Sequence, residues 1–188
     1  MEKTAKQLVN LISSANPEFT ELQLIKMEYG LHCFFCEITK FIPYLIIFYF
    51  FKVHIYFFIA VIFLSPLRAV TGGYHAKNYW SCFCLSLLIF AVIIYFGKTT
   101  ALNSGEILGI LSVSFILILS FSPVDNENKR IKNKERKMSL KRYGLIMLVL
   151  QGGLLYFIPL KYMSTAAISI AAALLLMMVG YLQHFKKS

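Results

Sequence analysis

The chain has 188 residues, of which 58% are hydrophobic and only 15% are charged, and its formal net charge is +10. A soluble domain has about 25% charged residues, so this composition excludes a conventional water-facing surface. The apolar residues form long runs instead of amphipathic stripes, which indicates that lipid is the solvent for most of the chain. The sequence therefore predicts an all-α integral membrane protein that lies in the lipid bilayer.

The N-terminal segment differs from the rest of the chain. The first 26 residues lack a continuous apolar core, so no signal peptide is expected. They are typical of a polar, amphipathic helix with a break at Asn16–Pro17. We expect residues 1–30 to form a cytoplasmic, amphipathic N-terminus within a single membrane domain that covers 1–188.

Six apolar segments follow, at about 31–51, 54–67, 81–97, 105–121, 143–160 and 164–182. The second is short for the roughly 20 residues that cross a bilayer, so it either crosses fully or re-enters. The predicted fold is therefore about six transmembrane helices, some of them short or re-entrant, after an N-terminal amphipathic helix.

Basic residues are concentrated in one predicted loop, 122–142, which holds eight of the nineteen Lys and Arg. Short cytoplasmic loops accumulate Lys and Arg, so this loop is predicted to be cytoplasmic, together with the segment 68–82 and both termini. Attraction to anionic lipid is a second use of the same charge. No aromatic-interleaved soluble motif accompanies the basic residues, so no nucleic-acid partner is expected.

The stretch PLRAVTGGYHAKNYWSCFCLS, residues 66–86, places two adjacent glycines, a histidine and two cysteines between apolar runs. Gly72 and Gly73 admit positive φ and close approach of another chain segment. His75 is the residue type best suited to accept and return a proton near neutral pH. A thiol close to such a base can become a thiolate, which is the nucleophilic form of cysteine.

Helical geometry favours Cys82 over Cys84 as the partner of His75, because residues seven positions apart lie on the same face of a helix and residues nine positions apart do not. Two helical turns nevertheless rise about 10.5 Å, far more than a hydrogen bond spans. A direct His75–Cys82 dyad therefore requires a non-helical connection between the two residues. If 68–84 were one straight helix, the dyad would fail.

Other interpretations of these residues stay open. A lone histidine near a membrane interface is often a satisfied interfacial residue, a buried cysteine often acts as a small hydrophobe, and paired glycines often serve helix packing. A metal site is a further alternative, formed by two close thiol pairs and two histidines: Cys33, Cys36, Cys82, Cys84, His32 and His75. The phenylalanines between the thiols favour packing instead, and no H-E-x-x-H is present, so no metal or cofactor is expected.

Two polar residues within the apolar segments are supporting candidates. Glu37 lies in the first predicted span, where an ionisable side chain is a functional hypothesis by default. Lys40 follows three residues later, so a helical ion pair is the simpler interpretation. Gln151, in the fifth predicted span, is expected to bond across helices or to help hold a substrate.

The spacing R-x4-G-x-H-x6-C, formed by Arg68, Gly73, His75 and Cys82, resembles the signature of the AgrB family of accessory gene regulator proteins. EYGL at 28–31 and SPVDNENKR with KERK at 122–137 are similar to further family features. The family often has Pro where this chain has Arg130, so the match in that loop is looser.

The resemblance implies a membrane-embedded cysteine endopeptidase of quorum sensing in the plasma membrane of a Gram-positive bacterium. Such a protein removes the C-terminal tail of an AgrD-like propeptide and promotes closure of a thiolactone or lactone ring. It implies that Cys82 is the nucleophile and His75 the general base. Arg68 occupies a family position, and its planar guanidinium would suit a substrate carboxylate.

A non-enzymatic alternative is a small membrane transporter or exporter of a peptide or hydrophobic solute, with Gly72–Gly73 as a hinge. The absence of internal repeats and of charged midplane residues argues against it. A homodimer, in which short spans pack against a second copy, also stays open.

Overall fold

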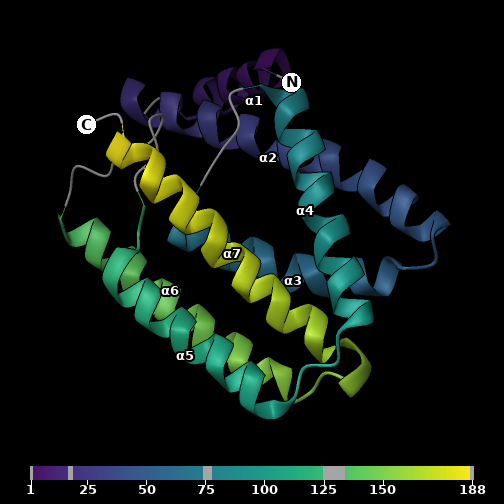
Figure 1. Cartoon of the computed structure of the whole chain (residues 1–188). Coiled ribbons are helices and arrows are strands. Elements are labelled where there is room, and N and C mark those ends of the chain that lie inside the picture. The colour runs from purple at the N-terminus through teal and green to yellow at the C-terminus, as the bar shows by residue number, and fades with distance from the viewer. Residues whose placement is uncertain (1, 17–18, 74–77, 125–133, 187–188) are drawn as a thin grey trace. The chain divides into compact units, whose positions relative to one another are not determined.

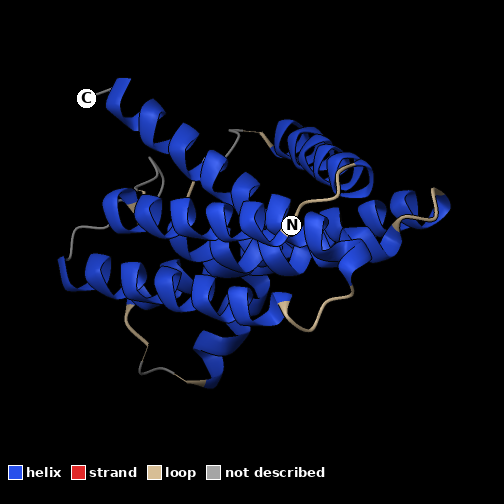
Figure 2. Ribbon diagram, turned by 60° about the horizontal axis from the view of Figure 1, so that its bottom comes forward, coloured by secondary structure: helices blue, strands red, loops and turns tan. Residues whose placement is uncertain are grey.

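A computed structural model describes residues 2–16, 19–73, 78–124 and 134–186. Every element among these residues is an α-helix, and no strand occurs in them (Figure 2). The helices are α1 Glu2–Ala15, α2 Glu21–Phe50, α3 His54–Thr71, α4 Tyr79–Thr99, α5 Ser104–Phe121, α6 Lys134–Leu155 and α7 Leu160–Lys186. The chain divides into two compact units, Met1–Phe51 and Lys52–Ser188.

The first unit contains α1 and α2, which pack against each other. In the amphipathic α1, Ala5 and Val9 are buried, whereas Leu11 on another face is 66% exposed. The helix ends at Ala15, so the predicted break after the N-terminal helix is confirmed; Pro17 lies outside the described residues. α2 begins ten residues before the predicted start at 31, because a capping box forms there. In it, the Thr20 N–H donates to Gln23 Oε1 over 2.9 Å.

The second unit is built around α7, which contacts α3, α4 and α5 (Figure 1). Small side chains on α7 allow these helices to approach closely, because Ala166, Ala167 and Ala173 are fully buried. At the crossing with α4, a Cβ on Gly97 would lie 2.7 Å from the Thr165 Cα. The two backbones therefore meet where neither helix has a bulky side chain.

Five of the described helices are long and apolar enough to cross a membrane: α2, α3, α4, α5 and α7 up to Gln183. This confirms the prediction of an all-α integral membrane protein. The second predicted span is one uninterrupted helix of 18 residues, four residues longer than expected. Its length of about 27 Å is close to the thickness of the hydrocarbon core.

The fifth predicted span, 143–160, is the one that differs most from the structure. α6 runs from Lys134 to Leu155, and its first half is the charged sequence KERKMSLKR. Helix formation starts earlier than predicted because Lys, Arg and Glu are good helix formers, and it stops before Pro159, which disfavours helix in the preceding residue. α6 is not among the five helices that are apolar enough to cross.

Candidate active site

The glycine pair begins at the C-terminus of α3. The Gly72 N–H donates to the Arg68 carbonyl over 3.0 Å, which closes the last turn of the helix. Gly72 then has φ 79° and ψ −168°, and Gly73 has φ 149°. Residues that have a side chain rarely adopt these positive φ values, so two consecutive glycines allow the chain to leave the helix abruptly here.

Two other parts of the second unit approach the backbone of this turn closely. The Val124 N–H, just after α5, donates to the Thr71 carbonyl over 3.0 Å. A Cβ on Gly72 would lie only 2.6 Å from the Val124 carbonyl oxygen, and a Cβ on Gly73 would lie 3.1 Å from the Leu176 carbonyl oxygen of α7. Both conformational roles expected of the glycine pair, positive φ and close approach of the backbone, are therefore present.

Cys82 lies in the first turn of α4. The helix starts at Tyr79 after the extended residue Asn78, and the Cys82 N–H donates to the Asn78 carbonyl over 2.9 Å. The Cys82 thiol is half-buried and belongs to no disulfide, whereas Cys84 is exposed. The two cysteines thus have different surroundings, as expected from their positions on opposite faces of a helix.

The connection between α3 and α4 is not a straight helix, because Gly72, Gly73 and Asn78 all have non-helical conformations. The condition set by the sequence for a His75–Cys82 dyad is therefore met. His75 itself lies in 74–77, outside the described residues, so its pairing with Cys82 stays a prediction. The predicted loop 68–82 is shorter than expected, since it is helical up to Thr71 and again from Tyr79.

Aromatic side chains surround the start of α4. The rings of Tyr79 and Trp80 lie 5.6 Å apart between centroids, and those of Trp80 and Phe83 lie 6.1 Å apart. Trp80 is 72% exposed. Exposed aromatic residues at a helix end are typical of the boundary between lipid and water, so this cluster is consistent with a Cys82 close to that boundary.

A basic helix end lies on the same side of the second unit as the glycine turn. Lys134, Arg136 and Lys137 are exposed in the first turns of α6, so part of the predicted loop 122–142 is helical instead. Further along α6, a Cβ on Gly144 would lie 3.5 Å from the Thr71 Cγ2. α6 therefore contacts the end of α3 at Gly144, just after its charged first half. Arg68, half-buried in the last turn of α3, adds a cation to this end.

Gln151 is buried within the second unit, with only 1% of its surface exposed. Its Nε2 donates to the Phe63 carbonyl over 2.9 Å and to the Ile62 carbonyl over 3.4 Å, both on α3. The expected bond across helices is thus present, and a role in holding substrate stays a prediction.

Glu37 belongs to the first unit. Its Oε1 lies 2.7 Å from the Lys40 Nζ, so the helical ion pair expected from the sequence is formed. On the same helix, the Cys36 Sγ lies 3.8 Å from the His32 Nε2. Among the described residues, no three His, Cys, Asp or Glu side chains are grouped so that they could hold a metal ion.

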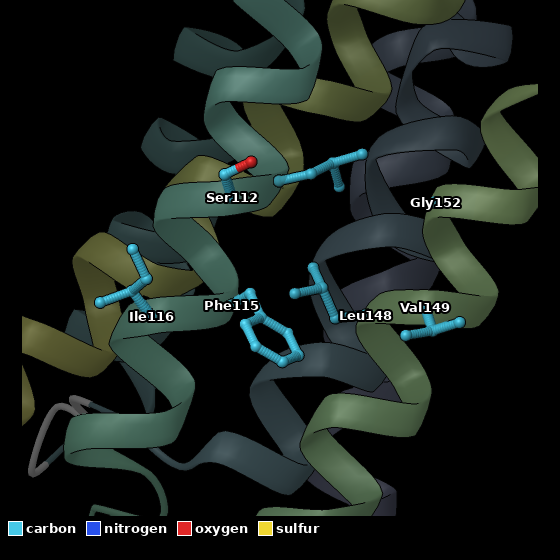
Figure 3. A pocket seen from close by; sticks show the side chains of 7 residues that line it. Ser112, Phe115, Ile116, Leu148, Val149 and Gly152 are labelled. Atoms are coloured by element: carbon cyan, nitrogen blue, oxygen red, sulfur yellow. The ribbon is translucent and has the colours of Figure 1, made fainter.

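A shallow apolar hollow of about 440 Å³ lies between α5 and α6 (Figure 3). Its lining contains none of the predicted site residues and consists of Leu111, Ser112, Phe115, Ile116, Leu148, Val149 and Gly152. Apart from the Ser112 hydroxyl, its side chains are apolar, so it has few groups that could orient a peptide.

Sequence reasoning missed two contacts of the candidate site. The first is the bond between Val124 and Thr71, which joins positions far apart in the sequence and has no local signal. The second is the hydrogen bond from Gln151 to the Phe63 carbonyl, next to the proline inside α3, Pro66. A proline within an apolar helix leaves one carbonyl without its helical donor. The lone amide of Gln151, in an otherwise apolar segment, was the signal in the sequence that another helix supplies a donor.

Comparison with known proteins identifies the family. The family model for accessory gene regulator B, AgrB, matches residues 2–182. An AgrB-like protein of Clostridium beijerinckii is 30% identical over 156 residues, which cover 82% of this chain and 77% of that protein. Another, of Clostridium acetobutylicum, is 26% identical over 165 residues, 88% of this chain and 78% of that protein. No solved structure matches the chain. Because the family model covers nearly all of it, the chain belongs to the AgrB family of the accessory gene regulator quorum-sensing system.

Proposed function

We propose that this protein is a membrane-embedded cysteine endopeptidase that cleaves the C-terminal tail from an AgrD-like propeptide and promotes its cyclisation. Membership in the AgrB family implies an AgrD-related partner. In the proposed reaction Cys82 is the nucleophile and His75 is the general base. No metal ion or cofactor takes part.

One observation carries the proposal: the helix breaks between Thr71 and Tyr79, and Cys82 follows in the first turn after the break. An unbroken helix would hold His75 and Cys82 about 10.5 Å apart along its axis. The break removes that obstacle, and the half-buried Cys82 follows the histidine by only seven residues in the sequence.

The chemistry is covalent catalysis. The Cys82 thiolate attacks the scissile carbonyl, and His75 transfers a proton to the leaving amine, so that a thioester joins enzyme and propeptide. A thiol or hydroxyl within the peptide then attacks the thioester and releases a macrocycle. Exchange of one thioester for another is close to neutral in free energy, so a thiolactone can close without ATP. An apolar setting protects the thioester from water during this step.

The charged end of the second unit supports an orientation for the reaction. We place this end, with Lys134, Arg136 and Lys137, in the cytoplasm of a Gram-positive bacterium. Placing both chain termini on the same side of its plasma membrane requires α6 to cross in addition to the five helices that are apolar enough to do so. The opposite turns have a single lysine each, for example Lys98. The basic end would attract an acidic peptide tail, chiefly by speeding the encounter, and Arg68 would hold a carboxylate by its planar fork.

The test is co-expression with the tagged propeptide encoded beside this chain, with peptide masses measured for each variant. We expect Cys82→Ser and His75→Ala to abolish processing. Cys84→Ser, which removes an exposed thiol two residues away, is the matched control and retains processing. If Cys82→Ser still trims the propeptide, the covalent mechanism is wrong. A small peptide transporter would then be the better candidate, and export would be measured next.

A further inference from the structure

Pro66 interrupts the hydrogen bonding of α3 shortly before the glycine turn. Proline has no backbone N–H, so the carbonyl of Ile62, four residues earlier, loses its helical donor. In a membrane-spanning segment no water is at hand to replace that donor, and a carbonyl without a partner is costly. Some other group must therefore donate a hydrogen bond to the Ile62 carbonyl.

Gln151 of α6 provides the missing donor. Its Nε2 lies 3.4 Å from the Ile62 carbonyl oxygen and 2.9 Å from the Phe63 carbonyl oxygen. Both partners are acceptors, so the amide must present its NH₂ group to them. At 1% exposure Gln151 is shielded from lipid and water alike, and the interaction holds α6 against α3 directly at the proline.

α6 contacts α3 on both sides of this proline. The buried residues Gly144, Leu148, Gln151 and Leu155 recur at intervals of three and four, so they form one face of α6. Gln151 meets α3 at Phe63, and Gly144 meets it at Thr71. The two contacts are about 10.5 Å apart along α6 and about 12 Å apart along α3, so both fit one antiparallel pairing.

We propose that Gln151 is a positioning residue: by holding the Ile62 and Phe63 carbonyls beside Pro66, it fixes the last turn of α3 and the Arg68–Gly73 segment from which the chain continues to His75. This inference rests on the proposed function. Gln151 does not touch the reacting atoms in this scheme and acts through α3 alone. It also explains why a lone amide is buried in an otherwise apolar part of α6.

The decisive variants are Gln151→Leu and the double variant Pro66→Ala with Gln151→Leu. We expect Gln151→Leu to lower the rate of propeptide cleavage about tenfold or more, since small displacements near a reacting group cost one to two orders of magnitude. In the double variant the N–H of residue 66 again bonds to the Ile62 carbonyl, so thermal stability in detergent recovers. Cleavage stays low, because α6 no longer holds the end of α3.

Two results would overturn the inference. If the double variant cleaves like the wild type, Gln151 only satisfies a carbonyl and positions nothing. If Gln151→Leu alone leaves the rate unchanged, the contact does not matter for the reaction. Leu150→Ala, at a position 58% exposed on the same helix, is the matched control and should leave cleavage unchanged.

A second measurement separates this inference from the proposed function, because it needs no activity. With the native cysteines replaced by serine, Thr71→Cys and Gly144→Cys place one thiol on each helix where the two meet, since a Cβ on Gly144 would lie 3.5 Å from the Thr71 Cγ2. We expect the cross-link to form readily when Gln151 is present and its yield to fall when Gln151→Leu is added. An unchanged yield refutes the positioning role, even if Cys82 proves not to be the nucleophile.

Discussion

Gly72→Ala tests directly how the candidate site is built. The substituted residue would have to keep φ 79° and ψ −168°, a conformation that is almost restricted to glycine. Its new Cβ would also lie 2.6 Å from the Val124 carbonyl oxygen, a distance at which the backbone must move. Since Val124 donates to the Thr71 carbonyl, this movement would break the hydrogen bond that joins the two segments.

The magnitude follows from these two effects. A non-glycine residue in this region of φ and ψ costs about 1–3 kcal/mol. Loss of the Val124–Thr71 hydrogen bond adds about 1 kcal/mol. We therefore expect Gly72→Ala to lower the free energy of unfolding by about 2–4 kcal/mol, and to reduce propeptide cleavage, because the displaced turn leads to His75.

The assay is unfolding of the purified protein in mixed micelles by titration with a denaturing detergent, alongside the cleavage assay. Gly153→Ala is the control, because a Cβ at that helical position would meet nothing within 4 Å. It should be neutral or stabilise the protein by about 0.5–1 kcal/mol, since alanine is the better helix former. A Gly72→Ala protein as stable as the wild type would refute this account of the turn.

Two further substitutions probe the frame around the site. Gly97→Ala should lower the free energy of unfolding by about 1–3 kcal/mol, because its Cβ would lie 2.7 Å from the Thr165 Cα where α4 crosses α7; Gly109→Ala, with open space around it, is the control. Asn103→Ala should cost about 0.5–2 kcal/mol in the same unfolding titration, because it removes the side chain that accepts from the Glu106 N–H at the start of α5. Unchanged midpoints would contradict the close crossing and the cap, respectively.

Much of the fold was predictable from the sequence because apolar runs of this length have few other solutions. Uninterrupted hydrophobic segments predicted the helices of the second unit, and the polar N-terminus predicted α1. The errors lie where the local signals conflict. Charged residues of α6 were assigned to a loop by the positive-inside rule, although Lys, Arg and Glu also favour helix. The length of α3 was underestimated because the apolar run was taken to end at 67, whereas the helix continues to Thr71.

For the candidate site, the sequence predicted the break in the helix, but it did not predict the contacts that hold the turn. The need for a non-helical connection follows from the spacing of His75 and Cys82, and the glycine pair indicates where the helix is left. The contacts of Thr71 with Val124 and of Gln151 with Phe63 join positions remote in the sequence. Contacts of that kind depend on tertiary packing, and a single sequence does not show which residues of two helices lie opposite each other.

The last turn of α3 is held from separate parts of the chain, and this arrangement predicts a measurable coupling. Gln151 contacts α3 at Phe63, and Val124 contacts its end at Thr71, next to Gly72. The sites of Gln151→Leu and Gly72→Ala are about 14 Å apart along α3. Substitutions so distant and without shared partners normally have additive effects on the free energy of unfolding.

If the end of α3 moves as one body, however, releasing it at Phe63 relieves part of the strain that Gly72→Ala imposes at the turn. The double variant should then be more stable than the sum of the single effects predicts, by at least about 0.5 kcal/mol. Strict additivity would show that each contact acts only locally, and the positioning role of Gln151 would have to be abandoned.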